Sequence, residues 1–349
     1  MKVFKQVLGV DVSQKELVVT LGRMNEDFSI EFYSYRVFSN KETGFIALLK
    51  WLKKNTLTDI SLRVVLEATG VHHQKFAHFL VDNCIDVSIV LPNKISNYFR
   101  TLEIKTITDK SCSEAIARFG LERKLENWKK PNKVYKLLQQ LTRERDQIVC
   151  ERTMIKNQIH AETTEAEPNE RSLKRLEERL LFMNKQEKEI KQDISDIIQQ
   201  DKTVEEQLGY MTSIPGVSVL TASTILGETN GFELIRNKRQ LTSYAGFDVK
   251  EKLSGTSVHG KPKISKRGNK YLRKCLHLPS LCSVKYILEY KELYTRIVSK
   301  NGIKLKALIA VQRKMLELTY VLFKNQTVYN PNYEIQKRVP LKEENTLTS

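Results

Sequence analysis

The sequence predicts an α/β fold at the N-terminus, followed by a remainder that is mainly helical. Up to about residue 125, short apolar runs typical of strands alternate with stretches of helical periodicity. From residue 132 onward, apolar residues recur first in heptads and then at the spacing of amphipathic helices. With 349 residues, the chain is long enough for two domains and a connector.

The first region, residues 1–131, is expected to form strands and helices in alternation. In chain order they are strands 5–12, 15–24 and 28–38, helix 44–54, strand 62–69, helix 72–83, strand 87–92 and helix 111–124. The second and third strands alternate between apolar and polar side chains, as half-exposed strands do. The turn-prone residues 25–27 join them, so the first three strands should form a meander. This order fits a mixed sheet of the ribonuclease H type.

Residues 132–205 are expected to form an antiparallel coiled-coil hairpin, because their apolar residues follow heptad spacing on both sides of Pro168. The first helix contains Val134, Leu137, Leu141, Ile148 and Ile155 at these positions, and the second contains Leu173, Leu176, Leu180, Met183, Ile190, Ile194 and Ile197. Several inner positions of the first helix are polar, namely Glu144, Glu151 and Gln158. This helix is therefore expected to pair loosely or with another subunit.

The remaining chain is expected to contain a helical domain, residues 206–329, and a disordered tail, residues 330–349. Residues 211–228 predict a helix, a Pro-Gly turn and a second helix, and residues 238–247 predict a short helix that ends at glycine. A basic stretch follows, and then largely helical sequence up to Phe323. The tail is polar and contains Pro331 and Pro340.

The net charge of +17 favours a polyanionic partner, because each phosphate that a basic residue neutralises releases condensed counterions. This charge alone does not separate nucleic acid from an anionic membrane surface. No apolar run approaches the roughly 18 residues of a membrane-spanning helix. The N-terminal apolar run is too short for a signal peptide and is interrupted by Asp11. The five cysteines form no CxxC pair, which indicates a reducing cytoplasm and argues against a structural zinc site.

Three acidic residues occupy the ends of expected elements. Asp11 ends the first strand, Glu67 ends a later buried strand, and Asp109 precedes a helix. Because strand ends meet at one edge of a sheet, carboxylates far apart in sequence can converge there. Hard oxygen ligands suit Mg²⁺, and two such ions can stabilise the attacking and leaving oxygens in phosphoryl transfer. For each acid taken alone, a solvated surface position is the alternative.

The stretch from Lys250 to Lys274 contains nine Lys or Arg residues and one acid, Glu251. This local excess predicts a phosphate-facing loop, in which glycines permit close approach of the backbone. The cationic residues expected to contact nucleic acid are Lys261, Lys263, Lys266, Arg267, Lys270 and Arg273. The serines Ser254 and Ser257 are either hydrogen-bond donors to phosphate or candidates for a nucleophile.

Several short motifs occur in a defined order along the chain. They are GVDVSQKE, LEATGVHH, KTITDKSCSEAIARFG, the heptad hairpin, SIPGVSVLTASTILGE, RQLTSYAGF and SGTSVHGKPKISKRGNKYLR. Each fragment alone is weak, whereas the ordered set is specific. From Val7 to about Tyr329, the chain resembles the DEDD transposases of the one-ten insertion-sequence family, which includes the Piv-type invertases.

The resemblance implies a RuvC-like N-terminal domain of the ribonuclease H fold, a coiled coil for assembly and a C-terminal transposase domain. It implies a recombinase that excises and inserts a mobile element, with a structured bridge RNA that selects target and donor DNA. It further implies a serine that forms a covalent phosphoserine link to DNA while the RuvC-like site assists with Mg²⁺. Dimers and tetramers with a composite site shared between subunits are implied as well, in the bacterial cytoplasm and on the nucleoid during recombination.

By this resemblance, the family's first three acids correspond to Asp11, Glu67 and Asp109, which would be catalytic and would bind the metal. The fourth family acid lies three residues after the third, where this sequence has Cys112. A neutral thiol is a poor ligand for Mg²⁺. Three interpretations are open: three acids suffice, Ser113 or Glu114 compensates, or metal binding and activity are weakened.

The resemblance also implies that the nucleophile is Ser254, the serine of an SG pair, with Ser257 as the second candidate. No residue is assigned as the base that activates it. Two other functions stay open. The RuvC-like acids alone would make a metal-dependent nuclease or junction resolvase, and Cys112 is compatible with a catalytically impaired relative that binds nucleic acid.

Overall fold

The structure is a computed structural model that describes residues 2–104, 106–233, 235–251, 253–254, 258–260 and 263–333. For residues 253–254 and 258–259 it describes the backbone alone. The chain divides into two compact units, and the division falls between Lys130 and Pro131.

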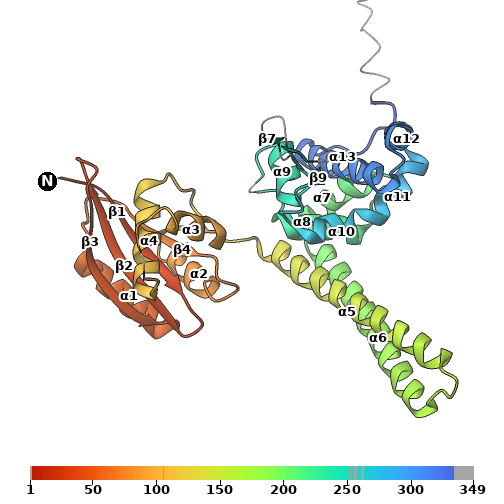
Figure 1. The fold of residues 1–349 in the computed structure, drawn as a ribbon, viewed down its shortest axis with the longest axis horizontal. Coiled ribbons are helices and arrows are strands. Elements are labelled where there is room, and N and C mark those ends of the chain that lie inside the picture. The colour runs from red at the N-terminus through yellow and green to blue at the C-terminus, as the bar shows by residue number, and fades with distance from the viewer. Residues whose placement is uncertain are drawn as a thin grey trace, which may run out of the picture. The chain divides into compact units, whose positions relative to one another are not determined.

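The first unit is built on a five-stranded sheet with the strand order β3-β2-β1-β4-β5 (Figure 1). The strands are β1 (Val3–Val12), β2 (Glu16–Asn25), β3 (Ile30–Ser39), β4 (Leu62–Glu67) and β5 (Asp86–Val90). The first three are antiparallel neighbours, whereas β4 runs parallel to β1 and β5 runs parallel to β4. This confirms the meander and the mixed sheet of the ribonuclease H type that the sequence predicts.

Helices cover both faces of this sheet. They are α1 (Glu42–Asn55), α2 (Gln74–Asp82), α3 (Pro92–Phe99) and α4 (Asp109–Glu122). One hydrophobic cluster joins α1 and α2 to strand residues that include Leu8 and Val10. A second cluster joins α3 and α4 to Val7 and Val65. Since side chains alternate along a strand, the residues of β1 that share a face with Val7 point toward α4.

The strand β2 is more buried than its alternating sequence predicts. Instead of being half-exposed, all side chains from Leu17 to Leu21 are buried. The physical reason is that β2 lies between two other strands and that α4 also covers its second face, where Thr20 and Ser113 share a hydrogen bond of 2.7 Å. The exposed side chains fall on the edge strand β3, in which Tyr35 is 43% exposed.

The second unit is mainly helical. Its helices are α5 (Lys133–Thr164), α6 (Glu170–Gln200), α7 (Lys202–Thr212), α8 (Val219–Thr229), α9 (Lys238–Ala245), α10 (Lys270–Cys275), α11 (His277–Tyr286), α12 (Leu288–Asn301) and α13 (Lys304–Asn325). The long helices α5 and α6 pack side by side as a hairpin (Figure 1). One core includes Leu138 and Ile194 from the hairpin together with Ile225 and Leu316 from the helices beyond it. The division of this unit into a coiled-coil domain and a C-terminal domain stays a prediction.

The start of α5 departs from the predicted heptad seam. Leu137 was expected at an inner position but is 46% exposed, whereas Tyr135 and Leu138 are buried. This part of α5 packs on α8, because Gly227 lies against the α5 backbone: a Cβ at Gly227 would stand 2.7 Å from the amide nitrogen of Gln139. The first turns of α5 therefore pack on the helical core as well, while Leu137 lines a surface hollow together with Ile197 of α6.

Two further features concern the ends and the surface of the chain. Within the described part of the chain, no helix is both long and apolar enough to cross a membrane. Of the expected tail, residues 334–349 lie outside the described residues. Just before it, the backbone N–H of Tyr329 donates to Ser213 Oγ at 2.8 Å, which ties the end of the helical region to the turn after α7.

Candidate active site

Asp11 and Glu67 lie at the carboxyl ends of two adjacent parallel strands. The strands β1 and β4 are in register at Val10 and Leu66, so the next residues along each strand are Asp11 and Glu67. Asp11 is two residues beyond Gly9, which faces α4, and therefore lies on the same face of the sheet. The register thus brings two carboxylates together on the face that α4 covers.

The helix α4 brings Asp109 to the same group. Gly9 of β1 lies directly beneath this helix, because a Cβ at Gly9 would stand 2.3 Å from the backbone nitrogen of Ala117. The N-terminus of the helix is fixed by a capping box. The backbone N–H of Ser111 donates to Thr108 Oγ1 at 3.1 Å, and the backbone N–H of Thr108 donates to Ser111 Oγ at 2.8 Å. Asp109 is therefore held as the first residue of α4.

The acids interact electrostatically. Burial raises the pKa of Asp11, and the charge of Asp109 raises it further. Burial also raises the pKa of Glu67, with the charge of Asp11 as the second cause. Burial raises the pKa of the Cys112 thiol as well, and the charges of all three carboxylates add to this increase. Cys112 thus lies within electrostatic range of Asp11, Glu67 and Asp109.

The donor atoms of this group suit a hard divalent cation. Carboxylates that raise one another's pKa lose this repulsion when a cation binds between them. Among the described residues, however, no three Asp, Glu, His or Cys side chains lie close enough together to surround an ion. The donor chemistry therefore fits a divalent cation, and the side chains of Asp11, Glu67 and Asp109 would have to move closer together to hold it.

The neighbours of Cys112 do not replace the missing carboxylate. Ser113 is buried and shares its hydroxyl with Thr20 of β2 at 2.7 Å. Glu114 pairs with Lys110 at 3.9 Å, one turn earlier on the same helix. Neither residue contributes to the raised pKa of Asp11 or Glu67. The interpretation in which Ser113 or Glu114 compensates therefore has no support in the geometry.

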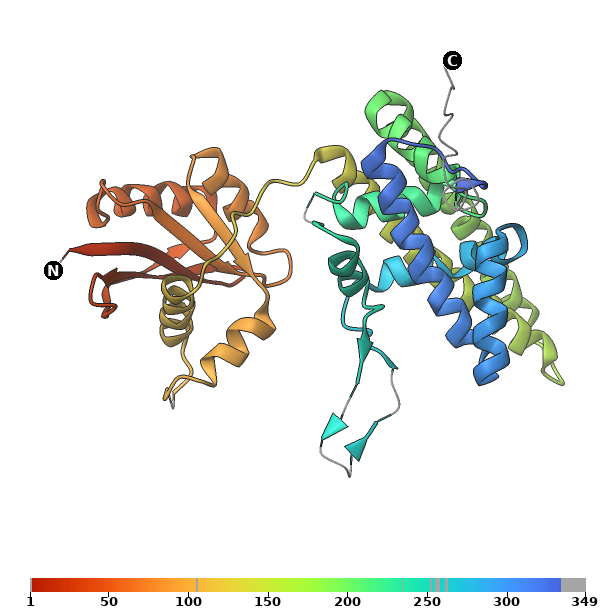
Figure 2. The ribbon, with the colours of Figure 1, turned by 90° about the horizontal axis from the view of Figure 1, so that it is seen from above.

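In the second unit, the stretch expected to be a basic loop contains short antiparallel strand pairs. β6 (Val249–Lys250) pairs with β9 (Lys263–Ile264), and β7 (Leu253–Ser254) pairs with β8 (Val258–His259). Figure 2 shows these strands extending from the helices of the unit. The expectation of a loop was wrong here, because Val249, Val258 and Ile264 are β-branched residues that favour extended backbone.

Ser254 lies in β7, where its backbone pairs with Val258 of β8. Its side chain is outside the part that the structure describes. Ser257, the second candidate nucleophile, and Lys261 also lie outside the described residues. Of the other expected contacts to nucleic acid, the exposed side chains are those of Lys263, Lys266, Arg267 and Lys270, whereas Arg273 is half-buried.

The residues that follow β9 are fixed to the end of α9. Ser265 Oγ donates to Asp248 Oδ1 at 2.6 Å, and the backbone N–H of Lys266 donates to the backbone oxygen of Gly246 at 3.1 Å. Arg273 Nη1 donates to the backbone oxygen of Ala245 at 2.7 Å. These hydrogen bonds fix the backbone from which the exposed cations project.

Two models of transposase families match the two regions that carry these features. Residues 8–168, which include the three acids and Cys112, match a model described as a transposase, of the DEDD type from IS110 elements. Residues 209–295, which include Ser254 and the basic segment, match the model of the transposase IS116/IS110/IS902 family. The chain belongs to the IS110 family of transposases.

Curated relatives support this membership over most of the chain. The pilin gene-inverting proteins of Moraxella lacunata and Moraxella bovis are each 25% identical to this transposase over 298 residues, which is 84% of this chain and 89% of theirs. An uncharacterized 43.6 kDa protein of insertion element IS110 from Streptomyces coelicolor is 27% identical over 119 residues, 34% of this chain and 29% of that protein. Among solved structures, Thermus thermophilus RuvC in complex with a Holliday junction substrate is similar at a TM-score of 0.28 and 9% identity, covering 35% of this chain and 99% of RuvC.

In this transposase, sequence reasoning missed a buried acid that fixes the basic segment. The side chain of Glu228, at the end of α8, is fully buried, and Arg143 of α5 donates to its two oxygens at 2.6 and 2.8 Å. Asn269, which caps α10, donates to the same carboxylate at 2.5 Å. The available signal was an acid at the end of an otherwise apolar helical stretch, VLTASTILGE, which is unusual unless the acid has a partner.

Proposed function

We propose that this transposase is a site-specific DNA recombinase that cuts and rejoins DNA through Ser254, assisted by a Mg²⁺-binding acidic site. The observation that carries the proposal is the convergence of Asp11, Glu67 and Asp109 at one edge of the sheet, in a chain of a transposase family. The pilin gene-inverting proteins share most of this chain's length, and their name describes the inversion of a gene. Inversion requires that DNA is cut and rejoined, which supports DNA as the substrate.

In the proposed reaction, the hydroxyl oxygen of Ser254 attacks a DNA phosphorus. A bond between phosphorus and the serine oxygen forms, the bond to one DNA oxygen breaks, and that oxygen takes up a proton. A hydroxyl of another DNA end then attacks the same phosphorus and releases the serine, so the number of phosphodiester bonds is conserved. The cations proposed to neutralise the phosphate charge are Lys261, Lys263, Lys266, Arg267, Lys270 and Arg273.

The acidic site is proposed to assist this reaction. Mg²⁺ bound by Asp11, Glu67 and Asp109 would neutralise charge on the reacting phosphate. The protein's own contribution is to hold these carboxylates at one edge, by the register of two strands and by the capping box of α4. Cys112 provides no hard oxygen, so the proposal rests on three carboxylates rather than four.

The proposed partners are a bridge RNA, which would select donor and target DNA, and further copies of the chain in a dimer or tetramer. Both are implied by the resemblance of the chain's ordered motifs to the family. The strongly positive net charge is compatible with two nucleic acids bound at once. We assign the protein to the bacterial cytoplasm, at the nucleoid during recombination.

Substitution of Ser254 tests the proposal against a metal-dependent nuclease or junction resolvase, which would use the acids alone. With Mg²⁺, the bridge RNA and duplex DNA that carries the element's ends, the unmodified protein should give recombined product and a covalent protein–DNA adduct. Both should vanish in Ser254→Ala and persist in Ser257→Ala. If Ser254→Ala still cleaves and Asp11→Ala does not, the enzyme is a nuclease.

A catalytically impaired relative is the second alternative, and the position of Cys112 among the three acids favours it. If the unmodified chain yields no product under these conditions while Cys112→Asp does, the impaired interpretation replaces the proposal. If the unmodified chain already recombines the ends, the impaired interpretation is excluded.

A further inference from the structure

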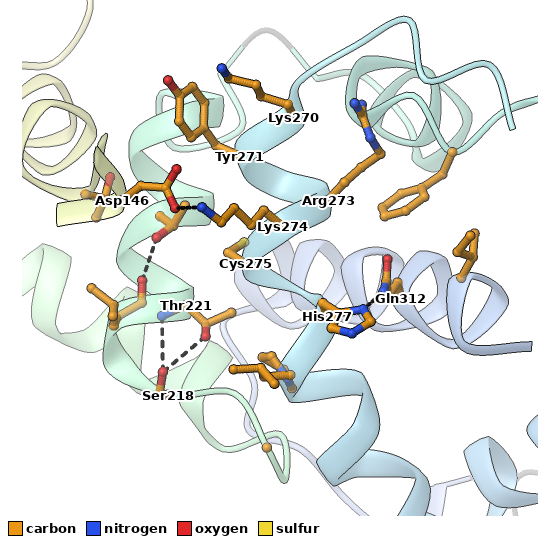
Figure 3. Close-up of a pocket in the computed structure, with 18 of the residues that line it drawn as sticks. Asp146, Ser218, Thr221, Lys270, Tyr271, Arg273, Lys274, Cys275, His277 and Gln312 are labelled. Atoms are coloured by element: carbon orange, nitrogen blue, oxygen red, sulfur yellow. Dashed lines mark hydrogen bonds and ion pairs between the residues drawn. The ribbon is translucent and has the colours of Figure 1, made fainter. Parts of the chain in front are cut away.

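A cavity of about 920 Å³ lies within the second unit, among α5, α8, α10, α11 and α13 (Figure 3). Its volume falls in the range of roughly 300–1,000 Å³ that is typical of cavities for small organic ligands. The acidic site belongs to the first unit, so no residue of that site lines this cavity. Neither the proposed nucleophile nor the proposed metal accounts for it.

The cavity carries an excess of positive charge. Its cationic lining residues are Arg145, Lys266, Lys270, Arg273 and Lys274. Lys274 is paired with Asp146, and Arg145 with Glu187 of α6, so the excess charge comes from Lys266, Lys270 and Arg273. Figure 3 shows Lys274 and Asp146 pointing toward each other across the cavity wall, with Lys270 at one end. Lys266 has a left-handed backbone with φ of 53°, which is uncommon for a residue other than glycine. The charge of the walls favours an anionic ligand.

The rest of the lining is largely apolar. Leu278, Pro279, Leu305 and Ile309 contribute walls that offer no charge, and Phe247 contributes an aromatic ring. A simple inorganic anion would leave this apolar part without a partner. A purely apolar ligand would leave Lys266 and Lys270, which carry no ion pair among the described residues, without an anionic partner. The cavity therefore suits a molecule that combines a flat apolar part with phosphate.

His277 gives this apolar end a fixed hydrogen-bonding group. Gln312, only 4% exposed, places its Nε2 3.2 Å from His277 Nδ1 (Figure 3). In the imidazole tautomer that carries its proton on Nε2, Nδ1 accepts this hydrogen bond and the Nε2–H is a donor. An oriented N–H donor beside apolar walls can read the edge of a nucleobase.

We propose that this cavity takes up one unpaired nucleotide of a nucleic-acid strand. Its phosphate contacts the cations of α10, and its base enters the apolar end beside His277. The inference rests on the proposed function, because it requires that the protein handles nucleic acid. The inserted base accounts for the apolar walls and the imidazole, and its phosphate accounts for the excess of cations. Base contacts of this kind add to binding that otherwise depends on charge.

The test compares two single-stranded oligomers with the same number of phosphates: fluorescein-labelled oligothymidine and an abasic oligomer of equal length. The full chain is titrated without Mg²⁺, and binding is followed by fluorescence anisotropy. We expect oligothymidine to bind about fivefold or more tightly than the abasic oligomer, which is the effect of burying one base. His277→Ala should reduce this ratio while leaving the affinity for the abasic oligomer unchanged.

A matched pair of variants separates the cavity from the general charge of the protein. Leu278→Glu places a carboxylate in the cavity lining, whereas Leu288→Glu places one on α12 outside it; the two leucines are 73% and 68% exposed, so both variants should fold. We expect the ratio of the affinity for oligothymidine to that for the abasic oligomer to fall close to one in Leu278→Glu. In Leu288→Glu, this ratio should equal that of the unmodified protein.

Three results would overturn the inference: no preference for oligothymidine, an equal ratio in both leucine variants, or tight binding of thymidine monophosphate with no preference between the oligomers. The last would identify a site for a free nucleotide. The Ser254 adduct is measured separately on duplex DNA. If the adduct forms but oligothymidine is not preferred, only the inference about the cavity is overturned. If oligothymidine is preferred but no adduct forms, only the proposed recombinase reaction is overturned.

Discussion

At the scale of single residues, Cys112 is the position that decides how the acidic site works. Its thiol lies within electrostatic range of Asp11, Glu67 and Asp109, which is where a fourth carboxylate would interact with the other three. A carboxylate there adds a hard ligand for a divalent cation, but it also adds repulsion when no cation is bound. The two effects have opposite signs and can be separated by adding metal.

We predict that Cys112→Asp makes the protein less stable without metal and more responsive to Mg²⁺. The midpoint of thermal unfolding should fall by a few degrees in EDTA, because a fourth negative charge joins the group. Millimolar Mg²⁺ should raise the midpoint more in this variant than in the unmodified chain, since tighter binding to the folded state stabilises it further. Cys84→Asp, at an exposed cysteine of the same unit, is the control and should show neither effect. Equal responses to Mg²⁺ in both variants would mean that position 112 does not face the metal.

At the scale of secondary-structure elements, the contact between β1 and α4 holds the acidic site together. The helix can lie on the strand only because residue 9 has no side chain, and this contact sets the position of Asp109 relative to Asp11. In the second unit, Glu228 has a comparable role, because it joins α5, α8 and the first turn of α10 through Arg143 and Asn269.

We predict that Gly9→Ala destabilises the first unit by about 1–3 kcal/mol or more, because the added Cβ would overlap the backbone of α4. Displacement of the helix should also weaken the response to Mg²⁺. Gly209→Ala, on α7, is the matched control. Among the described residues beyond its own helical backbone, no atom lies within 4 Å of the place that its new methyl group would take, so this substitution should be neutral or stabilise by up to about 1 kcal/mol. Chemical denaturation measures both, and equal stabilities would contradict the tight contact.

We predict that Glu228→Gln destabilises the second unit by about 1–3 kcal/mol. The substitution removes the charge that balances Arg143 at a fully buried position, although Arg143 itself is 42% exposed and water screens part of the loss. The control is Glu189→Gln, which alters an exposed pair with Lys185 and should change stability by less than about 0.5 kcal/mol. Indistinguishable unfolding curves for the two variants would show that the buried pair does not stabilise the unit.

At the scale of the whole molecule, the sequence predicted the order of elements well because that order depends on local periodicity. The strands of the first unit, the turn before α8 and the end of α9 at Gly246 all follow from patterns of a few residues. The sequence also predicted that Asp11 and Glu67 lie close together, since this requires only that two strands end at the same edge of the sheet.

Features that depend on packing between distant segments could not be predicted in this way. The burial of β2 results from α4, about ninety residues later in the chain, as the contact between Thr20 and Ser113 shows. The start of α5 packs on α8 as well as on α6, and Leu137 is left at the surface, 46% exposed. The cavity near His277 collects residues from five helices, and no spacing in the sequence indicates that they meet.

The proposed reaction depends above all on a covalent link between Ser254 and DNA, and that link can be mapped. The full chain is incubated with Mg²⁺, the bridge RNA and duplex DNA carrying the element's ends. The DNA and protein are then digested, and the peptide that retains a nucleotide is sequenced by mass spectrometry. We predict a nucleotide on Ser254 that depends on Asp11, so that Asp11→Ala gives little or none. A nucleotide on Ser257 or on any other residue, or cleaved DNA ends with no protein attached, would contradict the proposed reaction.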